Sequence, residues 1–162
     1  MKSLAVLNLG KKMLSATRKV FTAVTATVLV LYSITLSNAA QLGHNYRVRL
    51  SPMPTTPQTV STITGGGEVQ LTLLGKTLTA IGAFSGMSSA ATNAHIHYGP
   101  PAQPGPVIHH LNFDENVSGE VSITIDLSEE QISALKSNSL YIQIHSIKNP
   151  AGELRGWAFP VS

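Results

Sequence analysis

Residues 68–84, EVQLTLLGKTLTAIGAF, alternate polar and apolar side chains on both sides of the turn Leu74-Gly75-Lys76. Such alternation places the apolar side chains on one face of an extended chain, as is typical of a half-buried β-strand. Two alternating runs joined by a short glycine-containing turn predict an antiparallel hairpin. This stretch therefore favours a β fold for the chain.

Further short runs of this kind predict strands along the rest of the chain, at 94–98, 106–111, 120–127, 140–145 and 153–159. The last two form a predicted hairpin around the turn at 148–152. A run at 46–50 is predicted to be an edge strand before a loop through Pro52, Pro54 and Pro57, because proline cannot donate to a strand ladder. Ser128 begins a capping box, which predicts one short helix ending near Asn138.

The sum of these elements predicts an all-β fold, an antiparallel Greek-key β-sandwich or barrel of about eight strands with one short helix. The segment 40–64 is expected to supply the N-terminal strand and a proline-rich connection, and 65–162 the sandwich core.

The first 39 residues differ in composition from the rest. Residues 1–20 hold five cations and no acid, the uncharged run FTAVTATVLVLYSITL occupies 21–36, and Ser37-Asn38-Ala39 follows. This order predicts a secretory signal peptide cut after Ala39; the alternative is an uncleaved membrane anchor. In both cases the remainder is expected to be extracytoplasmic, either periplasmic or secreted, with membrane contact only through the N-terminal segment.

Composition narrows the function classes. The 162 residues include no cysteine, which excludes a disulfide scaffold, a zinc finger and a thiol enzyme. The formal net charge of +3 comes from the leader, because residues from Ala40 onward hold six Lys/Arg against eight Asp/Glu, a balance of −2. Such a domain lacks the electrostatic footprint of a nucleic-acid-binding protein.

Histidines suggest a metal site. Because strand side chains alternate between faces, His95 and His97 share a face, about 7 Å apart along the strand. His145 lies on the face of its strand opposite Ile144, so all three share an outer surface if the isoleucines face the core. Imidazole nitrogen suits copper and zinc, and the absence of cysteine excludes a blue-copper centre. Either His109 or His110 is a possible fourth ligand, because adjacent side chains point to opposite faces. The alternative is that the histidines are structural.

Two segments carry paired signatures. The first is AHIH at 94–97, followed by Gly-Pro at 99–100 and GPVI at 105–108; the second is LYIQIHS at 140–146, followed by NPAGELRG at 149–156. In this order they resemble the CHRD family, the domain first described in chordin, over roughly Gly65 to Phe159. Ser146 stands where that family often has threonine. The resemblance implies an extracytoplasmic β-sandwich and little about activity.

A second resemblance concerns four residues only. His95, His97, His145 and Arg155 follow the order of a His-x-His pair, a later histidine and an anion-guiding arginine that is similar to copper/zinc superoxide dismutases. The resemblance implies a site for a single copper ion, without zinc, that acts on superoxide, with Arg155 as a catalytic anion guide. The interpretation we favour for Arg155 is a structural hydrogen-bond donor that holds the turn 149–156. Two functions therefore stay open: a copper domain with dismutase-like activity, and a non-enzymatic exported binding or structural module.

Overall fold

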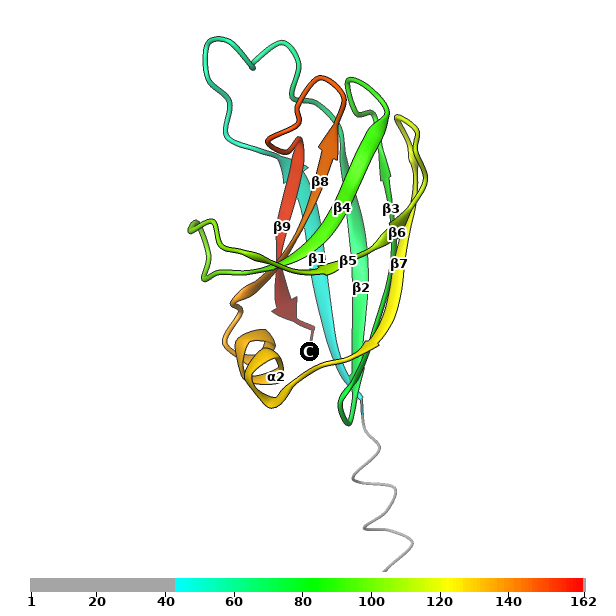
Figure 1. Cartoon of the computed structure of the whole chain (residues 1–162), viewed down its shortest axis with the longest axis vertical. Coiled ribbons are helices and arrows are strands. Elements are labelled where there is room, and N and C mark those ends of the chain that lie inside the picture. Colours follow the sequence, from blue (N-terminus) through cyan, green and yellow to red (C-terminus); the bar gives the residue numbers. More distant parts are fainter. Residues whose placement is uncertain (1–42, 162) are drawn as a thin grey trace, which may run out of the picture. The chain divides into compact units, whose positions relative to one another are not determined.

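The computed structural model of this chain describes residues 43–161, so the predicted leader at 1–39 lies outside the described residues. Nine strands and one helix form this part of the chain (Figure 1). They are β1 His44–Pro52, β2 Gly66–Leu74, β3 Thr77–Ser85, β4 Ala91–Tyr98, β5 Val107–His110, β6 Asn112–Phe113, β7 Gly119–Asp126, α2 Glu129–Lys136, β8 Leu140–Ser146 and β9 Leu154–Pro160. No helix among the described residues has the length and hydropathy needed to cross a bilayer.

The strands form one antiparallel sheet in the order β5-β4-β8-β9-β1-β2-β3-β7-β6. Its two end strands, β5 and β6, are separated in the chain by Leu111 alone. The sheet therefore curls until its ends lie near each other, and the Leu111 amide donates to the carbonyl of Ala94 at 2.9 Å. The prediction of an antiparallel all-β fold with one short helix is confirmed, with a nearly barrel-shaped sheet.

The quoted hairpin forms as its alternation predicts. Leu74 pairs with Thr77, and Gly75 occupies the turn at φ +62°. Val69, Leu71 and Leu73 are buried, whereas the polar residues between them are exposed. Burial of each aliphatic side chain of this size stabilises the fold by about 1.5–3 kcal/mol. The face of the hairpin that carries these side chains is therefore the face that packs into the core.

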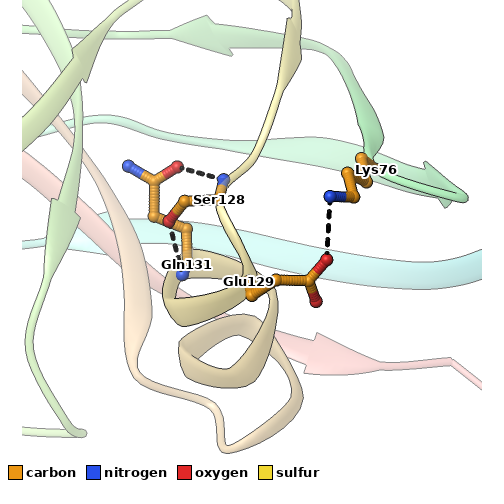
Figure 2. A network of polar contacts seen from close by, with 4 residues as sticks. All are labelled: Lys76, Ser128, Glu129 and Gln131. Carbon is orange, nitrogen blue, oxygen red and sulfur yellow. Dashed lines mark hydrogen bonds and ion pairs between the residues drawn. The ribbon is translucent and has the colours of Figure 1, made fainter.

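The helix begins where the capping box predicts (Figure 2). The Gln131 amide donates to Ser128 Oγ at 3.2 Å, and the Ser128 amide donates to Gln131 Oε1 at 3.0 Å. An exposed ion pair of 2.9 Å joins Lys76 Nζ, in the β2–β3 turn, to Glu129 Oε1. The helix ends at Lys136 with Ser137 as its C-cap, and Asn138 follows with φ +58°.

Two strand predictions differ from the structure. The run at 46–50 is not an edge strand, because β1 lies between β9 and β2. Pro52 falls at the end of β1, and Pro54 and Pro57 lie in the loop that follows, so none of them interrupts the central ladder. The two-residue strand β6 was not predicted, since two residues are too short to show alternation.

Candidate metal centre

The candidate site lies on the outer face of β4 and β8. In their register His97 lies opposite Tyr141, His95 opposite Gln143, and Asn93 opposite His145. Ile96, Ile142 and Ile144, the neighbours of these residues along each strand, are at most 2% exposed and form part of the core. The alternation therefore directs the histidines away from the core, as their spacing indicates.

The structure brings three of the five predicted ligands together. One ring nitrogen from each of His95, His97 and His145 lies within 4.8 Å of the others. Nitrogens bound tetrahedrally to one ion at about 2.0–2.1 Å are about 3.4 Å apart, so the widest pair needs to close by up to about 1.4 Å. The ring of His95 lies 5.7 Å from that of His97 and 5.1 Å from that of His145, between centroids. The three residues therefore fit a single small ion.

Backbone carbonyls fix the orientation of two imidazoles. His97 Nδ1 lies 2.9 Å from the carbonyl oxygen of Gly105, and His145 Nδ1 lies 2.9 Å from that of Pro150. A carbonyl oxygen only accepts, so each Nδ1 carries a proton, and in the neutral ring Nε2 is then the nitrogen with the free lone pair. Histidines that bind metals commonly donate their second ring nitrogen in this way.

Burial keeps the imidazoles of His95 and His97 neutral. His95 Nδ1 and His97 Nε2 are buried and lack a hydrogen-bond partner within the part of the chain that the structure describes. Burial, with the neighbouring His145, His110 and His97, lowers the pKa of His95 to about 4. Burial also lowers the pKa of His97, although the contact with Gly105 opposes this shift. Both rings are therefore neutral near neutral pH, the form that binds a metal ion.

Gln143 and Arg155 connect the site to the neighbouring strand. Arg155 Nε donates to Gln143 Oε1 at 2.7 Å, so the amide nitrogen faces the other way. This nitrogen donates to the carbonyl of Ala151 at 3.0 Å and lies 3.2 Å from His145 Nε2. A metal ion at His145 would displace only the second contact. Arg155 therefore supports the turn at 149–152 through Gln143, not by a direct hydrogen bond.

The structure separates the two possible fourth ligands. His110 lies opposite His95 on the same face, with ring centroids 4.7 Å apart, and its residue is exposed. His109 lies opposite Ile96, so its side chain is directed toward the core side. Of the two, His110 is beside the three-histidine group, but it does not belong to the group whose nitrogens lie within 4.8 Å.

Sequence reasoning missed an aromatic platform that holds the site. The Tyr141 ring stacks on the His97 ring, with centroids 4.7 Å apart and 9° between the planes. The Tyr141 hydroxyl accepts from the Gly105 amide at 3.0 Å, and Trp157 Nε1 donates to the carbonyl of Gly99 at 2.9 Å. These contacts fix the loop that carries the carbonyl partner of His97. The register of Tyr141 and Trp157 across β8 and β9 could not be known before the strands were paired.

A buried carboxylate, also missed, holds the loop beside His145. Glu153 is fully buried and accepts from Thr64 N at 3.1 Å, Ser88 N at 2.7 Å and Ser146 Oγ. Burial alone would raise the pKa of Glu153, but the hydrogen bonds from Ser146, Ser88 and Thr64 outweigh it and lower the pKa. Glu153 stands between Gly152 and Leu154, directly before β9, and no local pattern marks it as buried. A buried charge needs several donors, and two of them come from the distant residues Thr64 and Ser88.

Comparison with known families gives one match. The family model described as the CHRD domain matches residues 32–157, which is more than three quarters of the chain. The match extends the expected resemblance N-terminally, across β1 and into residues 32–39, which the sequence analysis assigned to the leader. No curated protein matches the chain significantly.

Proposed function

This chain belongs to the CHRD domain family, and on that basis we propose that it is an exported CHRD protein that binds one copper ion through His95, His97 and His145. The observation that carries the proposal is the approach of three imidazole nitrogens to within 4.8 Å of one another. Two of these rings have their tautomers set by backbone carbonyls.

The donor set favours copper among the available ions. It consists of three imidazoles, which suit copper, zinc, nickel and iron, and it lacks the thiolates that select softer metal ions. Divalent copper binds a given nitrogen site more tightly than the other divalent first-row metals do. The exposed His110, whose ring centroid lies 4.7 Å from that of His95, would be the additional ligand.

We further propose that the site removes superoxide. Copper bound there would supply one-electron redox chemistry. The contribution of the chain is electrostatic: Arg155 lies with its guanidinium carbon 5.1 Å from the Tyr141 ring centroid, and its positive charge is one of the causes that lower the pKa of His97. A fixed cation at this face would attract a small anion toward the histidines.

The alternative function is a non-enzymatic extracytoplasmic module. The hydrogen bond from the Gln143 amide to His145 Nε2 favours it, because a structural histidine needs such a partner. In this alternative the histidines hold the loops at 99–105 and 149–152 in place.

One titration separates these proposals. The protein is titrated with Cu(II), the bound metal is measured by elemental analysis, and superoxide decay is then followed with and without the metal. A stoichiometry of one copper per chain, lost in His95→Ala and His97→Ala but kept in His44→Ala, supports the site; His44 is an exposed residue at the start of β1. Absence of bound copper in the unaltered protein overturns the site. Copper without dismutation overturns only the enzymatic proposal.

A further inference from the structure

A cleft outside the histidine group lies over the outer face of β1 and β9. Its volume is about 790 Å³, within the range of small-molecule sites. Met53 and Pro54 border it after β1, Ala102 borders it from the β4–β5 loop, and Val161 borders it after β9. The cleft therefore has walls from three separate segments, which a flat sheet surface would lack.

Three arginines line this cleft, namely Arg47, Arg49 and Arg155. They are half of the six Lys/Arg residues after Ala40, and none of the eight Asp/Glu residues lines the cleft. Glu68, on β2, lies near Arg47, with 4.0 Å between its carboxylate and Arg47 Nε. Both side chains are about half exposed or more, so this ion pair is weak and cancels little of the positive charge of the cleft. The cleft thus concentrates positive charge in a domain whose net charge is negative.

Strand register explains how these side chains converge. Arg47 lies opposite Phe159, and Ser51 lies opposite Arg155, whereas the intervening Val48 and its partner Ala158 are buried. Arg49 follows Arg47 on the same face, about 7 Å along the strand. Arginines on β1 and β9 therefore flank an aromatic surface.

That surface comes from Trp157 and Phe159, which also line the cleft. The indole N–H of Trp157 is already donated to the carbonyl of Gly99. The ring therefore presents apolar surface, and the guanidinium groups supply the donors. The ion pairs among residues 43–161 involve Arg47 and Lys76 but not Arg49.

We propose that this cleft binds a small organic dianion with a flat apolar body, such as an aromatic dicarboxylate. Guanidinium groups bind carboxylates with paired hydrogen bonds. Arg47 and Arg49 are exposed on one face of β1, at backbone positions about 7 Å apart. The aromatic floor contacts the body of the ligand. The proposal does not depend on metal binding, because Arg47 and Arg49 lie on β1, away from the histidine strands β4 and β8.

Trp157 provides the measurement, because it is the only tryptophan in the chain and it lines the cleft. Its fluorescence is recorded while the protein is titrated with benzene-1,4-dicarboxylate. Separate titrations use the neutral isostere benzene-1,4-dimethanol and sodium sulfate at matched ionic strength. We expect saturable binding of the dicarboxylate, with clearly weaker binding of the diol and of sulfate.

Matched charge variants then locate the binding. Arg49→Gln should weaken dicarboxylate binding about tenfold, because a charged hydrogen-bond partner is lost. Lys136→Gln removes the same charge from the last turn of α2 and should leave the affinity unchanged. Far-UV circular dichroism checks that both variants keep the β fold.

Each outcome decides the proposal. Absence of saturable binding overturns the proposal. Equal binding of the diol also overturns it, because the negative charges of the ligand would then contribute nothing. Equal binding of sulfate does the same, because the aromatic body would then contribute nothing. Equal weakening by Arg49→Gln and Lys136→Gln also overturns it, because binding would then follow net charge. Copper binding retained by Arg49→Gln, together with dicarboxylate binding retained by His95→Ala, would show that the cleft and the histidine site are independent.

Discussion

Replacement of Gly156 by alanine should separate β9 from β1. A Cβ atom at this position would lie 2.2 Å from the carbonyl oxygen of Arg49, 2.7 Å from its carbonyl carbon and 2.9 Å from Val48 Cγ1. Ordinary contact begins at 3.4 Å. The strands must therefore move apart by about 1.2 Å at this point, in a packed interior that has little free volume.

The magnitude follows from which atoms collide. Overpacking typically costs about 1–3 kcal/mol, and here the nearest neighbour is backbone, which cannot rotate away as a side chain would. We therefore expect the free energy of unfolding to fall by about 3 kcal/mol. For a domain of this size each kcal/mol shifts the melting temperature by about 4 °C, which predicts a decrease of about 12 °C.

Thermal unfolding followed by circular dichroism tests this value, and Gly66→Ala is the matched control. Gly66 also lies in a strand, but its added Cβ would meet only the Leu50 carbonyl oxygen at 3.4 Å. The control should therefore stay within about 0.5 kcal/mol of the unaltered protein. A Gly156→Ala protein that melts within about 2 °C of the unaltered one would refute the reasoning, because the two strands would then have room for the methyl group.

Four further predictions concern the site and its supports. His97→Ala should weaken copper binding at least about 100-fold in a competition titration, whereas His44→Ala should not. Loss of a residue that only supports a metal ligand typically costs about 10–100-fold in affinity, and loss of the ligand itself should cost at least as much. Arg155→Ala should keep one copper per chain but slow superoxide removal, most strongly at low salt where steering is unscreened, and an unchanged rate at low salt would exclude an anion guide. Because the folded-state pKa of Glu153 is lowered from 4.5, its carboxylate stabilises the fold above that pH, and stability is lost as the pH falls through the folded-state value. Glu153→Gln should destabilise by about 2 kcal/mol and flatten the acid limb of the stability–pH curve; a limb of unchanged slope would assign the acid sensitivity to other groups. Ser128→Ala should cost about 1 kcal/mol in denaturant unfolding, because the amide of Gln131 loses its acceptor, and a smaller change than a few tenths would contradict the cap.

Local patterns in the sequence were sufficient for the elements themselves. The alternation at 68–84 defined both strands and the turn of the first hairpin, because strand side chains reverse direction at every residue and only one face is buried. The capping box at Ser128 placed the helix start, because it depends on contacts within one turn. The same local rule put His95 and His97 on one face, opposite Ile96.

Which strands become neighbours was decided only in the tertiary structure. The strand at 46–50, predicted to be an edge strand, is central because β9 pairs with β1. No pattern within residues 46–50 indicates this partner, which lies more than a hundred residues away in the chain. The pairing of β4 with β5 decided that His110 joins the face of His95 and that His109 does not. The same long-range pairings placed Gln143 between His95 and Arg155.

The chemistry of the candidate site shows the same division. The sequence by itself determined the residue types, their faces and the absence of thiolate ligands. Only the folded chain decided that carbonyls of Gly105 and Pro150 fix two imidazole tautomers and that burial keeps the pKa of His95 near 4. Hydrogen bonds and desolvation depend on atoms from distant segments that meet only when the sheet closes, and a periodic pattern carries no information about those encounters.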